Sequence, residues 1–133
     1  MIYRYALSYL ETWKKNPMRK PLILRGARQV GKTTLVENFA TEFDCFLKLN
    51  LDEEEDRLLF TRYKEIHRLI EAIFFHLQKN PTEGSTLLFI DEIQNSPEAV
   101  AILRYFHEKR PDIYVIAAGS LLENVIDRKI SFP

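Results

Sequence analysis

The chain has 133 residues, of which 46% are hydrophobic and 29% are charged, so it can form one globular domain with a buried core. Its 19 basic residues balance 19 acidic ones, and this neutral charge lacks the basic footprint of a dedicated nucleic-acid binder. No apolar run approaches the roughly 20 residues that cross a bilayer, so no membrane contact is expected. The single cysteine excludes an internal disulfide and indicates a reducing compartment, which predicts a cytoplasmic location.

The predicted elements alternate between helices and strands along the chain. Amphipathic periodicity predicts helices over residues 2–14, from Lys32 to about Phe43, from Tyr63 to Lys79, and after a capping Ser96. Short apolar runs predict strands over residues 21–25, 45–51, 86–90 and 113–118. An acidic run at residues 52–56 is typical of an exposed helix start. This alternation predicts an α/β fold, a three-layer sandwich with a parallel sheet between helices.

One stretch carries the clearest chemical pattern. The segment Gly26-Ala27-Arg28-Gln29-Val30-Gly31-Lys32-Thr33 fits G-x-x-x-x-G-K-[ST], the pattern of loops that surround phosphate groups, and it stands between a predicted strand and a predicted helix. Gly26 and Gly31 allow a tight turn and close approach of a ligand. The loop N–H groups and the start of the helix attract an anion. Lys32 supplies a cation for the outer phosphates, and Thr33 supplies a hydroxyl for Mg²⁺.

Polar residues follow the third and fourth predicted strands. Asp91 and Glu92 come directly after residues 86–90, and ligands bind at the carboxyl ends of strands in parallel sheets. Asp91 is placed to hold Mg²⁺ directly or through water, and Glu92 to orient or deprotonate an attacking water. Ser120 reaches the same edge after the fourth strand, where it either bonds the transferring phosphate or its water, or caps a helix at residues 121–128.

Three segments resemble a known family: Leu24–Thr34, Phe89–Gln94 and Ala118–Ser120. They resemble the branch of P-loop ATPases with an additional strand, which holds the AAA+ superfamily. More narrowly, they are similar to a prokaryotic AAA-type ATPase family usually found N-terminal to a DUF4143 domain. The resemblance covers nearly the whole chain and implies a P-loop NTPase sandwich with sheet order 1-4-3-2. It also implies that residues 1–133 are the N-terminal part of a single ATPase domain whose later strand and C-terminal domains lie outside the sequence.

The resemblance implies a module that binds and hydrolyses ATP with Mg²⁺. Catalysis is assigned to Lys32, Asp91 and Glu92, and the metal to Thr33 and Asp91. Asn50, at the end of the second strand, is expected near Glu92, because AAA+ proteins often use such a polar residue to hold the catalytic glutamate. The residues expected at the nucleotide are Gly26, Ala27, Arg28, Gln29, Val30, Gly31, Lys32, Thr33, Thr34, Asn50 and Ser120.

The resemblance also implies partners for the chain. AAA+ enzymes typically take a catalytic arginine from a neighbouring subunit, so it implies an oligomer, and the sequence does not identify the protein client. Such an arginine is worth about 10³–10⁵ in rate. The isolated chain is therefore expected to bind ATP with Mg²⁺ but to hydrolyse it slowly.

Other functions use the same motifs. An ATP-gated protein-interaction scaffold with little or no turnover would need the same residues, so the sequence does not separate it from a hydrolase. A small-molecule kinase is disfavoured by Glu92, because a carboxylate that activates water would waste ATP. GTP specificity is disfavoured because no Asn-Lys-x-Asp stretch follows the acidic pair.

Overall fold

The computed structural model describes residues 2–25 and 30–119 of the chain. Within these ranges the strands form one parallel sheet with the order β1-β4-β3-β2. The strands are β1 (Leu22–Leu24), β2 (Cys45–Asn50), β3 (Thr86–Asp91) and β4 (Ile113–Ala118). The predicted sheet order is confirmed, and each strand differs from its predicted range by one residue at most at either end.

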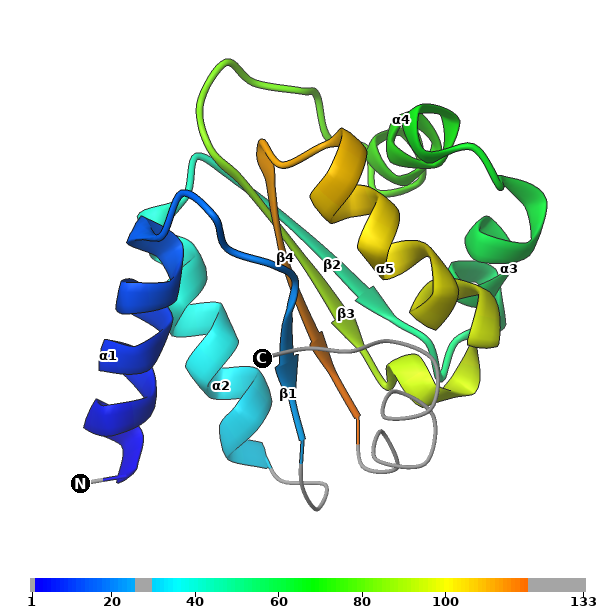
Figure 1. Cartoon of the computed structure of the whole chain (residues 1–133). Coiled ribbons are helices and arrows are strands. Elements are labelled where there is room, and N and C mark those ends of the chain that lie inside the picture. Colours follow the sequence, from blue (N-terminus) through cyan, green and yellow to red (C-terminus); the bar gives the residue numbers. More distant parts are fainter. Residues whose placement is uncertain (1, 26–29, 120–133) are drawn as a thin grey trace.

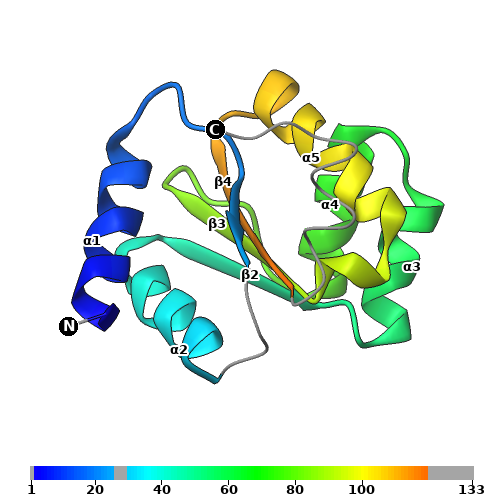
Figure 2. The ribbon, with the colours of Figure 1, turned by 60° about the horizontal axis from the view of Figure 1, so that its bottom comes forward.

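Helices cover both faces of this sheet, with α1 and α2 on one face and α3, α4 and α5 on the other (Figures 1 and 2). The helices are α1 (Ile2–Lys15), α2 (Val30–Phe39), α3 (Glu54–Arg62), α4 (Ile66–His76) and α5 (Pro97–Lys109). Two short 3₁₀ turns follow α2 and β3, namely η1 (Ala40–Glu42) and η2 (Ile93–Asn95). The predicted three-layer arrangement is therefore confirmed. No helix in the described ranges has the length and apolar composition needed to cross a bilayer.

Apolar side chains on the two faces of the sheet form two separate clusters. In β3, Leu88 and Ile90 belong to the cluster under α3, α4 and α5, whereas Leu87 and Phe89 belong to the cluster under α1 and α2. All four side chains are at most 1% exposed. A strand that is buried on both faces is apolar throughout, which explains the continuous apolar run in the sequence. The position of Asp91, the last residue of β3, is thus set by a fully packed strand.

The second helix differs from its prediction. The helix predicted from Lys32 to Phe43 begins two residues earlier, and its last part is the 3₁₀ turn η1. The Phe43 N–H closes this turn by donating to the Ala40 carbonyl at 3.0 Å, and Phe43 itself is extended. As a result, Lys32 and Thr33 lie inside the first turn of α2.

The helix predicted from Tyr63 to Lys79 is wrong at both ends, because α4 is shorter and α3 precedes it as a separate helix. The Glu65 carboxylate explains where α4 begins. Its oxygens accept the backbone N–H groups of His67 and Arg68, both at 3.0 Å, so Glu65 caps the helix. Of the acidic run at residues 52–56, Glu54, Glu55 and Asp56 form the first turn of α3, so the predicted helix start is confirmed.

Candidate functional site

The strands all end at one edge of the sheet, where α2 also begins (Figure 1). The Gly119 N–H donates to the Leu24 carbonyl at 3.4 Å, so the ends of β4 and β1 touch. The Leu51 N–H donates to the Asp91 carbonyl at 2.9 Å and joins the ends of β2 and β3. Ligands bind at this edge in open parallel sheets. The predicted site residues that the structure describes lie at these strand ends or at the start of α2.

Thr33 and Asp91 meet across this edge although they are 58 positions apart in the sequence. Thr33 Oγ1 lies 3.5 Å from Asp91 Oδ2, and both side chains are half-buried. Burial raises the pKa of the Asp91 carboxyl above its ordinary value, and the negative charge of Glu92 raises it further. The hydrogen bond from the Glu92 N–H, the Lys48 ammonium and the Thr33 hydroxyl lower that pKa and so oppose the rise. A cation placed here would stabilise the ionised carboxylate.

The first turn of α2 has the features of an anion site. Lys32 directly precedes Thr33, is half-buried, and shares its turn with no acidic residue. The N-terminus of a helix also carries a partial positive charge. A Cβ atom added to Gly31 would meet no atom of the described residues within 4 Å. Packing of the described chain therefore does not require glycine there, whereas close approach of a bound group would.

Glu92 begins a tight turn directly after β3. Its backbone is left-handed, with φ 54° and ψ 45°, which costs about 1–3 kcal/mol for a residue other than glycine. Its N–H donates to Asp91 Oδ1 at 2.9 Å. The Glu92 side chain is buried, and its Oε1 accepts a hydrogen bond from Gln94 Nε2 at 2.8 Å. Gln94 is the last residue of the segment Phe89–Gln94, but the sequence pattern alone predicts no role for it.

Asn50 ends β2 beside Asp91, which is its register partner in the sheet. Its side-chain oxygen accepts the Asp52 N–H at 3.0 Å, and its own N–H donates to Asp56 Oδ2 at 2.9 Å. Asp56 Oδ1 in turn lies 2.7 Å from Nε2 of His76, on α4. Asn50 therefore lies next to the acidic pair, and the bonds described for its side chain go to the turn after β2.

Comparison with known proteins decides the family. The family model for the AAA domain matches residues 18–131. The chain belongs to this family. As an AAA domain it is an ATPase-type, nucleotide-binding module with a P-loop. No curated protein matches the chain.

Among solved structures, the chain is similar to that of PCH-2 from C. elegans, with a TM-score of 0.60 and 13% sequence identity. The match covers 96% of this chain and 41% of that chain, so the chain spans less than half the length of the PCH-2 chain. At this identity the similarity shows the fold alone. The predicted P-loop NTPase sandwich is thereby confirmed.

The oxygen atoms at the end of β3 suit Mg²⁺. The Thr33 hydroxyl and the Asp91 carboxylate are the hard oxygen ligands that this ion prefers. Two oxygens 3.5 Å apart can both reach one ion when each Mg–O distance is about 2.1 Å. In the part of the chain that the structure describes, no group of three or more His, Cys, Asp or Glu residues could hold a metal.

The other predicted nucleotide-binding residues divide into two sets. Gly31, Lys32 and Thr34 lie in α2, where Thr34 is exposed. The predictions for Gly26, Ala27, Arg28, Gln29 and Ser120 lie outside the described residues, as does the side chain of Val30.

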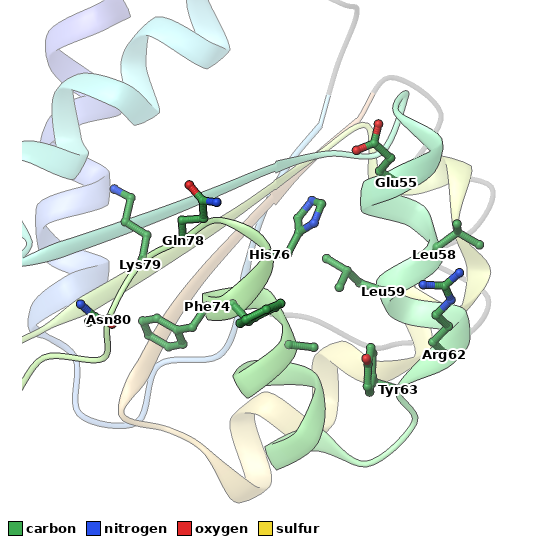
Figure 3. Close-up of a pocket in the computed structure, with 12 residues that line it drawn as sticks. Glu55, Leu58, Leu59, Arg62, Tyr63, Phe74, His76, Gln78, Lys79 and Asn80 are labelled. Carbon is green, nitrogen blue, oxygen red and sulfur yellow. The ribbon is translucent and has the colours of Figure 1, made fainter.

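A groove of about 870 Å³ lies between α3 and α4. Figure 3 shows its lining side chains coming from both helices and from the segment after α4. The described residues that line it include none of the predicted site residues. One of them, Phe75, is 86% exposed. The groove therefore lacks the combination of amine, hydroxyl and paired carboxylates that marks the sheet edge as the candidate site.

Proposed function

We propose that this AAA domain binds ATP with Mg²⁺ and hydrolyses it to ADP and phosphate, slowly when isolated. The observation that carries the proposal is the 3.5 Å approach of Thr33 Oγ1 to Asp91 Oδ2. Lys32 precedes Thr33 on α2, and Glu92 follows Asp91 after β3. An amine, a hydroxyl and two carboxylates at the end of a parallel sheet are the groups that phosphoryl transfer uses.

Each of these groups has one role in the proposal. Lys32 and the N–H groups of residues 26–33 hold the β- and γ-phosphates, and Ser120 contacts the γ-phosphate. Thr33 and Asp91 would hold Mg²⁺, which when bound would neutralise negative charge on the phosphates. Glu92 orients a water and takes its proton while the water oxygen bonds to the γ-phosphorus. The bond from that phosphorus to the β–γ bridging oxygen breaks, and ADP and phosphate leave.

Two substitutions test these roles separately. Lys32→Ala should abolish ATP binding, because it removes the cation that faces the phosphates. Glu92→Gln should bind ATP as the parent does but cleave it about 10²–10⁴-fold more slowly, because it loses the proton acceptor. Binding is measured by titration calorimetry, and cleavage by product formation with the chain in excess over ATP.

The matched control is Lys64→Ala, which removes an exposed lysine just before α4 and should change neither quantity. Cleavage by Glu92→Gln at the parent rate would disprove the role of Glu92. Undiminished ATP binding by Lys32→Ala would disprove the site itself.

A second candidate function is an ATP-gated interaction scaffold with little or no turnover. One observation favours it: Glu92 is only 9% exposed, which restricts the access of water to its carboxylate. In this function the same residues bind ATP, and the bound nucleotide orders loops for a protein partner. Product formation in a single turnover decides between the two, because a scaffold forms no product over hours.

A further inference from the structure

The side chains of Glu92 and Gln94 form a pair in the turn after β3. The proposed mechanism gives a role to Glu92 and none to Gln94. Gln94 Nε2 donates to Glu92 Oε1 at 2.8 Å, and the two residues are two positions apart. Glu92 is 9% exposed and Gln94 is half-buried, so the bond is partly shielded from water. The amide of Gln94 thus lies directly against the carboxylate that we assign to the attacking water.

The backbone that carries Gln94 is held in place from several sides. The Asn95 side chain donates to the Leu51 carbonyl at 3.2 Å and to Asp52 Oδ1 at 2.8 Å, which ties the turn to the loop after β2. The Asn95 N–H donates to the Glu92 carbonyl at 3.1 Å. The side chain of Ile93 is fully buried. Gln94 therefore projects from a fixed support, as a residue that orients a catalytic group must.

The other end of the Gln94 amide has no such support. Its Oε1 atom is buried and has no hydrogen-bond partner among the described residues. An unpaired buried acceptor is unfavourable and rare, so an apolar side chain of the same length would suit a purely structural role better. The opposite orientation of the amide would place this oxygen against a Glu92 carboxylate oxygen, which repels it. The bond to Glu92 is therefore the interaction that explains why an amide side chain occupies this position.

We propose that Gln94 is a positioning residue for hydrolysis, acting through Glu92. Its charge-assisted hydrogen bond fixes the Glu92 carboxylate beside Asp91 at the end of β3 and prevents it from turning away from the water site. Asn50 does not duplicate this bond, because the contacts described for its side chain go to Asp52. This inference rests on the proposed function, and it assigns Gln94 to the cleavage step and not to nucleotide binding.

Gln94→Met tests the proposal, because methionine is unbranched and similar in length but donates no hydrogen bond. The substitution also removes the unpaired oxygen, so the variant should fold. With the 133-residue chain in excess over ATP and Mg²⁺, cleavage should slow by about tenfold, because a misplaced base loses part of its effect. The affinity for ATP should stay within about twofold of the parent value, since no group that holds phosphate has changed.

Two controls separate positioning from a general effect. Gln78→Met makes the same chemical change at an exposed residue after α4 and should leave the rate at the parent value. In a Glu92→Gln background, Gln94→Met should slow cleavage by less than about twofold, because two residues that act through one group are not additive. A parent-like or faster rate for Gln94→Met, or an equal loss in both backgrounds, would overturn the proposal.

A spectroscopic measurement distinguishes failure of this inference from failure of the proposed function. In chains labelled with ¹³C at glutamate carboxyl groups, the Glu92 signal is identified by its absence from Glu92→Gln. It should move in Gln94→Met and stay unchanged in Gln78→Met. If the parent cleaves no ATP, the proposed function fails, and this signal then decides whether Gln94 holds Glu92. If the parent cleaves ATP but the signal does not move, the role of Gln94 alone fails.

Discussion

Folding shifts the pKa values of the Asp91 and Asp112 carboxyl groups in opposite directions. Burial raises the pKa of the Asp91 carboxyl, so the folded chain binds that proton more tightly than the unfolded chain does, and the ionised side chain reduces stability at neutral pH. The Arg110 guanidinium lowers the pKa of the Asp112 carboxyl through hydrogen bonds of 3.0 and 2.9 Å, so that ionised side chain adds to stability. The unfavourable charge lies where a cation is proposed to bind, and the favourable one lies away from the site.

The Arg110–Asp112 pair gives a pH-dependent prediction. Because the folded pKa of Asp112 is lowered, its contribution is present above the ordinary value of 3.8 and disappears as pH falls through the lowered one. Arg110→Met should therefore reduce the free energy of unfolding at neutral pH by less than about 1 kcal/mol, since Asp112 is 62% exposed. The difference from the parent should vanish in more acidic solution. Urea unfolding over a pH series measures it.

Arg68→Met, at an exposed position of α4, serves as the control for the loss of an arginine. It should show no such pH-dependent difference. A difference for Arg110→Met that persists unchanged into acid would mean that the bonds to Asp112 are not its cause.

Among the elements, α4 ends in a left-handed conformation that usually contains glycine, but its sequence has glutamine at that position. The residue after its cap, Gln78, has φ 56°, and the Lys79 N–H donates to the Phe74 carbonyl at 2.9 Å. The Gln78 N–H donates to the Phe75 carbonyl at 3.1 Å, which completes the pattern of a helix end that normally contains glycine. This end forms part of the groove between α3 and α4, so the helix terminates in a strained conformation beside exposed apolar side chains.

Gln78→Gly should therefore stabilise the chain, by about 0.5–1 kcal/mol after the extra freedom of glycine in the unfolded chain is subtracted. Gln78 is exposed, so the substitution removes little packing. Urea unfolding measures the change. The matched control, Glu71→Gly, makes an exposed position inside α4 glycine and should cost about 1 kcal/mol. A loss of stability for both variants would show that the left-handed backbone at Gln78 carries no strain.

Local signals in the sequence predict part of these elements. The strands follow from apolar runs, and the Ser96 cap of α5 is confirmed because its Oγ accepts the Ala99 N–H at 3.1 Å. The break between α3 and α4 could not be predicted from periodicity, because it depends on whether the Glu65 carboxylate turns back onto its own backbone. The Glu92–Gln94 bond depends likewise on a left-handed turn that side-chain patterns do not encode.

The contacts at the site likewise divide into those that the sequence predicts and those that it does not. The approach of Thr33 to Asp91 could be anticipated, because a phosphate-loop helix and a strand end of fixed order must meet at one sheet edge. The bonds of Asn50 to the turn after β2 could not be anticipated, since they depend on a turn that places Asp56 under the end of that strand. Sequence therefore predicts which elements meet, and side-chain geometry decides which bonds form there.

On the scale of the whole molecule, the expected catalytic arginine concerns more than one chain. Two arginines of the described chain have other contacts: Arg110 is bonded to Asp112, and Arg104 lies over the Tyr105 ring at 5.8 Å. Neither lies among the residues that gather at the sheet edge. The proposal of slow hydrolysis by the isolated domain rests on an arginine supplied by a neighbouring subunit, as the family resemblance implies.

If so, the rate of ATP cleavage per chain should rise with chain concentration, by up to about 10³–10⁵ on full assembly. Steady-state phosphate release over a dilution series measures this rise. An excess of Lys32→Ala chains, which keep every arginine but should not bind ATP, should accelerate a dilute sample of the parent. A rate per chain that is constant across the series, with or without these added chains, would exclude an arginine from a second subunit.

The pairing of β1 with β4 has a consequence for synthesis of the chain. Leu22 pairs with Ile116, and the sheet order gives β1 no other neighbour among the described strands. During synthesis on the ribosome, β1 therefore stays unpaired until nearly all the described residues have emerged. Contacts between such distant segments also form slowly. Of the described strands, β1, which precedes the phosphate loop, is thus synthesised first and joins the sheet last. A chain whose translation stops before β4 therefore has no assembled nucleotide site.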